Sequence, residues 1–371
     1  MKHLLLLSAL FLALLQAYGQ TGERLWEEGD LSWSDFKGEP NIYSSGASEL
    51  NYLLSYKTAR KKIGNTIVFL YETRNSINPD LCWVKDDERS DQLLRYNQVM
   101  FNIVELYRRR LQSQLHRADN LSMAENKFRN QYHQCSLEIR KFQDDTRAGT
   151  KAGAIAFWDE QIAGELRAMP LELVPPISDR NFGYGLNFGL GTGLFTASLG
   201  EHFTTPFSVI YGFDAAYKRN ILYLNATLAG NRVKREYGEG TTIWPENIRT
   251  TLAIIDVSLG RALIDNEKHK FAPFAGFGIL EFSAAGNVDE EYKDLRMVNY
   301  GFIFGLNYDF KFRKGVRLTP AVYSGSFKER AEQNLRIRLY ATTARFDQLE
   351  GASINLSIGY ALFGKLIRVD E

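Results

Sequence analysis

Histidine, the side chain that most often binds a catalytic metal, is rare in this sequence and is not spaced for that task. A zinc site on a helix commonly uses two histidines four residues apart, with a glutamate beside the first as general base. The histidines are His3, His116, His133, His202 and His269. No two of them have this spacing, so the sequence predicts neither a metal site nor a cofactor.

A second pattern with possible chemistry is the GLGTG stretch at 189–193, which imitates a glycine-rich phosphate-binding loop. A true loop of this kind follows a strand and opens a helix. Here the stretch lies inside an alternating segment with no helix after it, and we therefore exclude a nucleotide site. The formal net charge is +1, with both signs mixed along the chain, which gives no reason to expect a nucleic-acid partner.

The first residues have the features of an export signal. Lys2 and His3 precede an almost unbroken apolar run at 4–15, and small residues at Ala17 and Gly19 suit cleavage after Gly19. The run is shorter than the roughly 20 residues of a spanning helix. We therefore predict a signal peptide at 1–19 rather than a transmembrane anchor, and no spanning helix in the mature chain.

The two cysteines bear on the compartment in which the exported chain folds. In an oxidising periplasm Cys82 and Cys135 could form a disulfide, and we favour this possibility on the compartment alone. The alternative is a pair of buried free thiols, because the sequence does not give the distance between them.

The mature chain divides into two parts of different character. The pattern at 20–168 is mixed and predicts an α+β domain, while 169–180 carries Pro170, Pro175 and Pro176 and suits a linker. In the first part we expect a hairpin from runs at 50–56 and 66–71, with its turn at 61–64. Apolar spacing then predicts three helices, at 90–115, from Ser122 to about Phe142, and at 154–166.

The second part, 181–366, alternates with period two and predicts an all-β, eight-stranded antiparallel transmembrane barrel, followed by a tail at 367–371. The expected strands are 181–195, 206–217, 219–232, 249–262, 268–282, 296–312, 315–327 and 351–364. Each is long enough for the 9 to 11 residues of a tilted spanning strand. Short turns at 218–219, 265–267 and 313–314 alternate with longer polar loops, of which 328–351 is the longest. This is the outer-membrane arrangement, with short turns in the periplasm.

The two faces of these segments differ in kind. In the sixth segment Tyr300, Phe302 and Phe304 share a face with other large apolar residues, whereas Gly301 and Asn307 lie on the other. A soluble sandwich would place Lys and Glu opposite its apolar face. Small and polar residues there suit a narrow lumen, and long aromatic residues suit lipid contact. The segment 181–364 therefore resembles the small eight-stranded outer-membrane barrel families of Gram-negative bacteria, although the last aromatic, Phe363, is not terminal as it usually is in them.

Four stretches of the first part resemble the secreted bacterial family of putative zinc proteases. They are WSDFKG at 33–38, CWV at 82–84, LLRYNQVMFNIVELYRRRL at 93–111, and DTRAG at 145–149 before Trp158. The resemblance implies that the family's HEQxH motif falls on Tyr96, Asn97 and Met100, and its later histidine on Ala148. None of these four can replace a zinc ligand or the general base. They also fit an apolar helix stripe, and we predict a pseudo-enzyme whose degenerate positions are core residues.

These observations predict a non-enzymatic outer-membrane barrel protein whose N-terminal domain lies in the periplasm and acts in binding or scaffolding at the cell envelope. Outer-membrane lipid is the expected partner of the barrel, and a periplasmic or envelope protein is a possible partner of the domain. A filled lumen is expected rather than a general diffusion pore. Two alternatives stay open: a metal-dependent peptidase tethered to a barrel, and a soluble secreted binding protein with a lipocalin-like cup.

Overall fold

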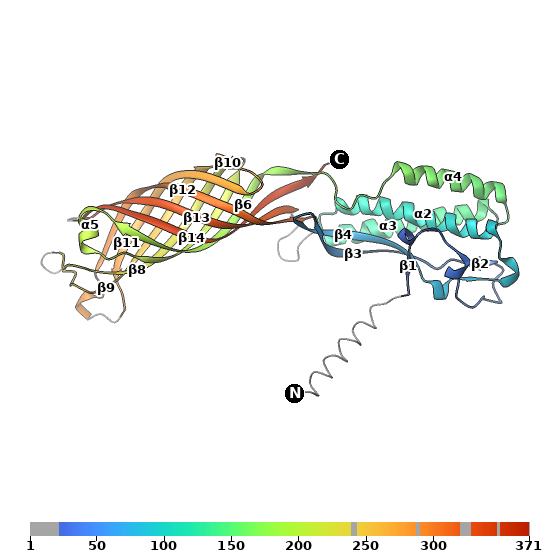
Figure 1. Ribbon diagram of the computed structural model, residues 1–371, viewed down its shortest axis with the longest axis horizontal. Helices are drawn as coiled ribbons and strands as arrows, with labels where there is room; N and C mark the ends of the chain where they lie inside the picture. Colours follow the sequence, from blue (N-terminus) through green and yellow to red (C-terminus); the bar gives the residue numbers. More distant parts are fainter. Residues whose placement is uncertain (1–21, 239–242, 287–289, 320–327, 347–348, 371) are drawn as a thin grey trace, which may run out of the picture.

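The computed structural model describes residues 22–238, 243–286, 290–319, 328–346 and 349–370. It is elongated, with a strand-built part at one end and a helix-rich part at the other (Figure 1). The predicted signal peptide at 1–19 lies outside the described residues. Within them, no helix is both long and apolar enough to cross a membrane.

The strand-built part is a closed antiparallel barrel, as the sequence predicts. Its strands are β6 (Ile177–Phe195), β7 (Phe207–Tyr217), β8 (Asn220–Arg232), β9 (Arg249–Arg261), β11 (His269–Ala284), β12 (Arg296–Arg317), β13 (Glu329–Arg345) and β14 (Glu350–Val369). Each pairs antiparallel with the next, and β14 pairs with β6, which closes the ring. The short strand β10 (Ile264–Asp265) adds only a bridge beside β11.

Side chains alternate between the two faces of the barrel wall as expected. On β12 the outward side chains of Tyr300, Phe302 and Phe304 are 79%, 62% and 55% exposed, whereas the inward Asn307 is 2% exposed. Large apolar residues therefore cover the outside, and small or polar residues fill the inside. This is the reverse of a soluble barrel, in which the apolar face is the core.

The position predicted for the seventh strand, 315–327, is wrong. Strand β12 continues through the expected turn at 313–314 as far as Arg317, and the seventh strand is β13, which occupies most of the expected loop at 328–351. Residues 320–327 lie outside the described residues. On β13 the outward Leu335 and Leu339 alternate with the inward Arg336 and Arg338. Because two arginines occupy the inward face, the segment does not show the small-residue pattern of the other strands.

Strand β6 already begins at Ile177 and β14 runs to Val369, so the strands extend into the predicted linker and tail. The connections at the helical end of the barrel are 218–219, 262–268 and 318–328. Those at the far end are 196–206, which contains α5 (Ala197–His202), then 233–248, 285–295 and 346–349. The longer connections thus gather mainly at the end away from the helices, with 318–328 the exception.

The N-terminal domain packs three helices against a two-stranded hairpin. The hairpin is β3 (Tyr52–Ile63) and β4 (Thr66–Ile77), and the helices are α2 (Asp91–His116), α3 (Leu121–Asp145) and α4 (Ala152–Ala168). The hairpin is longer than predicted, and its turn falls at 64–65. The second helix begins one residue before Ser122, because the Asn120 side chain accepts a hydrogen bond from the Met123 N–H at 2.7 Å and caps it.

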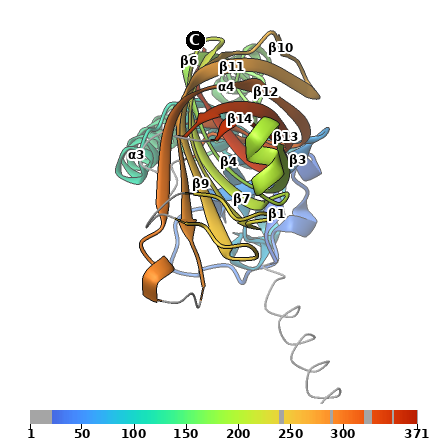
Figure 2. The same cartoon turned by 90° about the vertical axis from the view of Figure 1, so that its left-hand side faces the viewer.

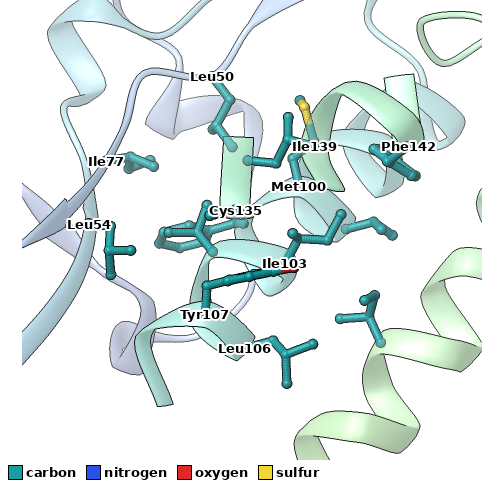
Figure 3. Packing of buried hydrophobic residues seen from close by; sticks show 14 of the residues in the cluster. Leu50, Leu54, Ile77, Met100, Ile103, Leu106, Tyr107, Cys135, Ile139 and Phe142 are labelled. Atoms are coloured by element: carbon teal, nitrogen blue, oxygen red, sulfur yellow. The ribbon is translucent and has the colours of Figure 1, made fainter. Parts of the chain in front are cut away.

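Short elements complete this domain. They are β1 (Arg24–Leu25), β2 (Ser48–Glu49), β5 (Trp83–Val84) and the 3-10 turns η1 (Trp26–Glu28), η2 (Trp33–Asp35), η3 (Pro79–Leu81) and η4 (Asp86–Glu88). The core lies between the hairpin and the helices, where Leu54, Ile103 and Phe142 are almost fully buried (Figure 3).

The two parts of the molecule share backbone hydrogen bonds. Strand β4 runs parallel to the end of β12, with Thr66 opposite Lys314 and Phe69 opposite Arg317. A small apolar cluster forms around this pairing, made by Val68, Leu70, Val316, Leu318 and Ile367. The hairpin tip therefore lies against the barrel rim, and the sheet of the N-terminal domain continues into the barrel wall.

Candidate functional site

The positions that would correspond to the first zinc ligand and the general base are part of the helical core. The Tyr96 ring is 5% exposed and stacks on Phe142 with ring centroids 5.1 Å apart. The fully buried Asn97 side chain donates to Ser48 Oγ at 3.0 Å and to the Leu93 carbonyl at 2.9 Å. Its hydrogen bonds hold the helix to the segment before the hairpin and leave no free group for proton transfer.

The two other degenerate positions lie nearby. Met100 is 5% exposed, and its sulfur is 3.8 Å from the amide nitrogen of Gln143. Ala148 lies in the turn between α3 and α4 at a φ of +52°. Its neighbour Gly149, at a φ of +93°, lies so close to Tyr96 that a Cβ there would be 3.2 Å from the ring. The fold thus brings the four predicted positions to one region, but as packing. Among the described residues, no group of three His, Cys, Asp or Glu could hold a metal ion.

The possible disulfide between Cys82 and Cys135 is not formed, and both cysteines are buried free thiols. Cys82 follows η3, where its sulfur accepts a hydrogen bond from the Asn51 N–H at 3.2 Å. Cys135 packs within α3. Burial raises the pKa of Cys82 to about 11 and that of Cys135 to about 12. Both side chains are therefore protonated at neutral pH and behave as small apolar core residues.

Replacing Tyr96 with alanine is expected to destabilise the N-terminal domain by about 3–5 kcal/mol, the usual effect of removing a buried aromatic ring. Four of the five tryptophans, Trp26, Trp33, Trp83 and Trp158, belong to this domain, so fluorescence during urea unfolding reports on it in the full chain. Tyr132→Ala, at a tyrosine 43% exposed on α3, is the matched control and should cost much less. Equal effects would contradict the assignment of Tyr96 to the core.

A network of buried charges fills the middle of the barrel lumen. The Arg336 guanidinium donates to Asp309 Oδ1 at 2.7 Å and to Asp214 Oδ2 at 2.7 Å, and all three side chains are at most 5% exposed. These residues come from β13, β12 and β7, so the network connects opposite sides of the wall. Two carboxylates held by one planar guanidinium form a strong arrangement in a region of low dielectric.

A second buried pair extends the network. Arg338 Nη2 is 3.1 Å from both carboxylate oxygens of Asp256, and the guanidinium lies 4.1 Å from the centroid of the Phe274 ring. Next to it, the Thr227 and Tyr340 hydroxyls are hydrogen-bonded at 3.0 Å. The middle of the lumen is therefore occupied by side chains, which supports the expectation that the barrel is not a general pore.

Aromatic rings close the end of the lumen away from the helices, the end that faces the viewer in Figure 2. Phe203, which follows α5, is 1% exposed and packs on Phe282 with ring centroids 4.6 Å apart. Trp244, Phe195 and Phe346 contact the same group of rings. Sequence reasoning missed this cap and the charge network. The available signal was the presence of Asp, Arg and Phe on the inward face, where most residues are small.

The buried imidazole of His116 lies at the end of α2 nearest the barrel. Gln112 uses its oxygen for the Thr73 N–H and its nitrogen for the Tyr71 carbonyl, which fixes the orientation of the amide. The amide nitrogen therefore donates to His116 Nε2, at 2.9 Å, and this ring nitrogen must be unprotonated. Burial, with the nearby Lys328 and Arg117, lowers the pKa of His116 to about 4, although a hydrogen bond to the Leu173 backbone opposes the shift.

This histidine predicts a pH dependence of stability. Its pKa is lower in the folded chain than in the unfolded chain, so the unfolded chain binds the proton first. Its contribution is complete above about pH 6.5 and is lost as the pH falls towards 4, by on the order of 3 kcal/mol. Urea unfolding followed by tryptophan fluorescence should show a weaker dependence between pH 6.5 and 4 for His116→Gln than for the parent chain. His133→Gln, at an exposed histidine, should leave the dependence unchanged.

Comparisons with known proteins add the following. The chain matches no protein-family model and no curated protein. Among solved structures it is similar to Neisserial surface protein A, with 11% identity and a TM-score of 0.32, over 51% of this chain and 99% of that one. It is also similar to Ail of Yersinia pestis in complex with the heparin analogue sucrose octasulfate, with 9% identity and a TM-score of 0.25, over 50% and 97%.

A third similar structure is the N-terminal β-barrel domain of Pseudomonas aeruginosa OprF, with 11% identity and a TM-score of 0.25, over 50% of this chain and 99% of that one. Each comparison covers about half of the chain. The barrel is defined by the strand pairing described above. The similarity of the N-terminal domain to zinc proteases stays a prediction.

Proposed function

We propose that this protein is a non-enzymatic outer-membrane protein whose barrel spans the bilayer and carries a periplasmic binding or scaffolding domain. The observation that carries the proposal is the barrel wall, which is closed, apolar and aromatic on its outer face and polar on its inner face. In a bilayer every backbone polar group has to be paired within the protein, and closure achieves this. A lipocalin-like cup would need an open apolar interior, whereas this interior holds buried ion pairs.

The orientation follows from the connections. An even number of strands brings both ends of the barrel chain to the same side, and short turns usually face the periplasm. Two of the three connections on the side of the N-terminal domain are short. This supports a periplasmic position for the domain and an external position for the aromatic cap.

For the N-terminal domain we propose a pseudo-peptidase that binds or scaffolds an envelope partner. The positions that would carry the chemistry are packed or hydrogen-bonded within the core, which supports the absence of hydrolysis. Its backbone connection to β12 holds the domain at a fixed place beside the barrel. Ile42 and Tyr43, adjacent in a loop, are 80% and 92% exposed, and such apolar exposure suits contact with a partner.

Electrophoresis of the membrane fraction, with and without boiling, tests the barrel. A form that migrates faster without boiling and shifts on heating is the expected result for a closed membrane barrel. Recovery of the chain in the soluble periplasmic fraction without a shift would overturn the proposal. Zinc analysis of the purified full chain tests the pseudo-enzyme assignment, because one bound zinc per chain would favour the tethered peptidase.

A further inference from the structure

A basic groove lies where the tip of the β3–β4 hairpin meets the barrel rim. It has a volume of about 1000 Å³, and seven of its 13 lining residues are Lys or Arg, against one acidic residue, Glu267. Its two walls come from distant parts of the sequence, the hairpin tip at 60–67 and the ends of the barrel segments at 267–268 and 310–314. The parallel pairing of β4 with β12 holds these walls together.

Three of the seven cations already have carboxylate partners. Lys61 pairs with Glu72, Lys314 pairs with Glu267, and Lys311 lies 2.6 Å from Asp265 and 3.0 Å from Glu332. Lys311 is also buried, so it adds little to the outer wall.

The remaining cations are available to a ligand. Arg60 lies over the ring of Phe69, with the guanidinium carbon 6.0 Å from the ring centroid. Lys62, Lys268 and Arg313 are exposed, and none has a side-chain partner among the described residues. Three exposed donors around one hollow provide a field that attracts a phosphate or another compact anion.

The floor of the groove is apolar. Phe310 and Phe312 line it, and their side chains are 39% and 53% exposed on the outward face of β12. They continue the aromatic row that begins with Tyr300 and Phe302 on the same face. The groove thus combines a lipid-facing aromatic floor with a cationic wall at the end of that row, where the membrane surface would lie.

We propose that this groove binds the headgroup of an anionic phospholipid in the inner leaflet, an inference that rests on the proposed membrane position of the barrel. The free cations contact the phosphate, and an acyl chain lies along Phe310 and Phe312. A soluble acidic polymer would use the cations alone and would leave the aromatic floor uncovered, so the combination favours a lipid. The hairpin tip, rather than the barrel alone, completes the site.

Native mass spectrometry of the full-length protein in detergent tests this proposal with phosphatidylglycerol and phosphatidylcholine as probes. We expect retained phosphatidylglycerol in preference to phosphatidylcholine. The groove variant, Lys62→Gln with Lys268→Gln and Arg313→Gln, should bind phosphatidylglycerol at least about tenfold more weakly, because each cation near an anionic lipid contributes measurably. The control variant changes Lys37, Lys127 and Arg140 to glutamine, which are also two lysines and an arginine but do not line the groove, and it should bind like the parent.

Several outcomes would overturn the inference. Equal binding of both lipids to the parent would do so, as would equal phosphatidylglycerol binding by the groove and control variants. Inorganic phosphate that displaces the lipid completely at equal concentration would show an anion site without a lipid preference. All samples are first checked for the heat-induced gel shift, so that loss of the barrel, which would refute the proposed function, is distinguished from an intact barrel that does not select anionic lipid.

Discussion

Arg336→Ala is expected to destabilise the barrel by about 3–5 kcal/mol, because it leaves the Asp214 and Asp309 carboxylates buried without a counter-charge. The urea concentration at which the fast-migrating unboiled form disappears from the gel measures the effect. Arg336→Lys should fall between the parent and the alanine variant, since an ammonium group keeps the charge but cannot form the two-sided fork.

Two controls isolate the cause. Arg345→Ala removes an exposed arginine from the same strand and should change the transition little. Arg336→Met combined with Asp214→Asn and Asp309→Asn removes all the charges and should recover much of the lost stability. If Arg336→Ala unfolds at the same urea concentration as the parent, the network does not hold the lumen together.

Phe302→Arg is expected to lower the stability of the inserted barrel by about 2–4 kcal/mol. Phe302 is 62% exposed near the middle of the outward row of β12 and contacts Phe277 with ring centroids 5.0 Å apart. An arginine at the bilayer midplane has this cost, whereas an arginine at the interface costs about 0–1 kcal/mol. Urea unfolding from lipid vesicles, followed by the gel shift, measures it.

The same substitution at Val298, towards the outer end of the row, serves as the depth control and should cost much less. In a water-soluble barrel, charged substitutions at two such exposed positions would both fall near ±0.5 kcal/mol. A large difference between them therefore tests for lipid around the wall, and a small cost at both positions would contradict membrane insertion.

Alternation predicted most of the barrel correctly because the inward residues of most strands are small or uncharged. On β6, outward Leu186 and Phe188 alternate with inward Asn187 and Gly189, and this contrast marks a strand without any tertiary information. Strand β13 was placed wrongly for the opposite reason. Its inward Arg336 and Arg338 look like loop residues in the sequence, and only the facing Asp214, Asp256 and Asp309 explain their position. Those partners are far away in the sequence, so the pattern of one segment cannot reveal them.

The N-terminal domain shows the same limit. Helix periodicity located all three helices and assigned Tyr96 and Met100 to an apolar stripe, where the structure places them. The expectation of a disulfide used only the compartment, and the positions of Cys82 and Cys135 depend on how the hairpin, η3 and α3 pack together. The parallel pairing of β4 with β12 is equally invisible in the sequence, because it joins segments about 250 residues apart.

That parallel pairing also sets an order on assembly. Until β12 takes its place, the backbone groups at the start of β4 are an open strand edge, and such edges readily pair with other chains. The free cations at the hairpin tip, Lys62 among them, disfavour this unwanted pairing while the edge is open. The periplasmic domain therefore becomes complete only when the barrel does, so its finished edge records that the wall beside it has formed.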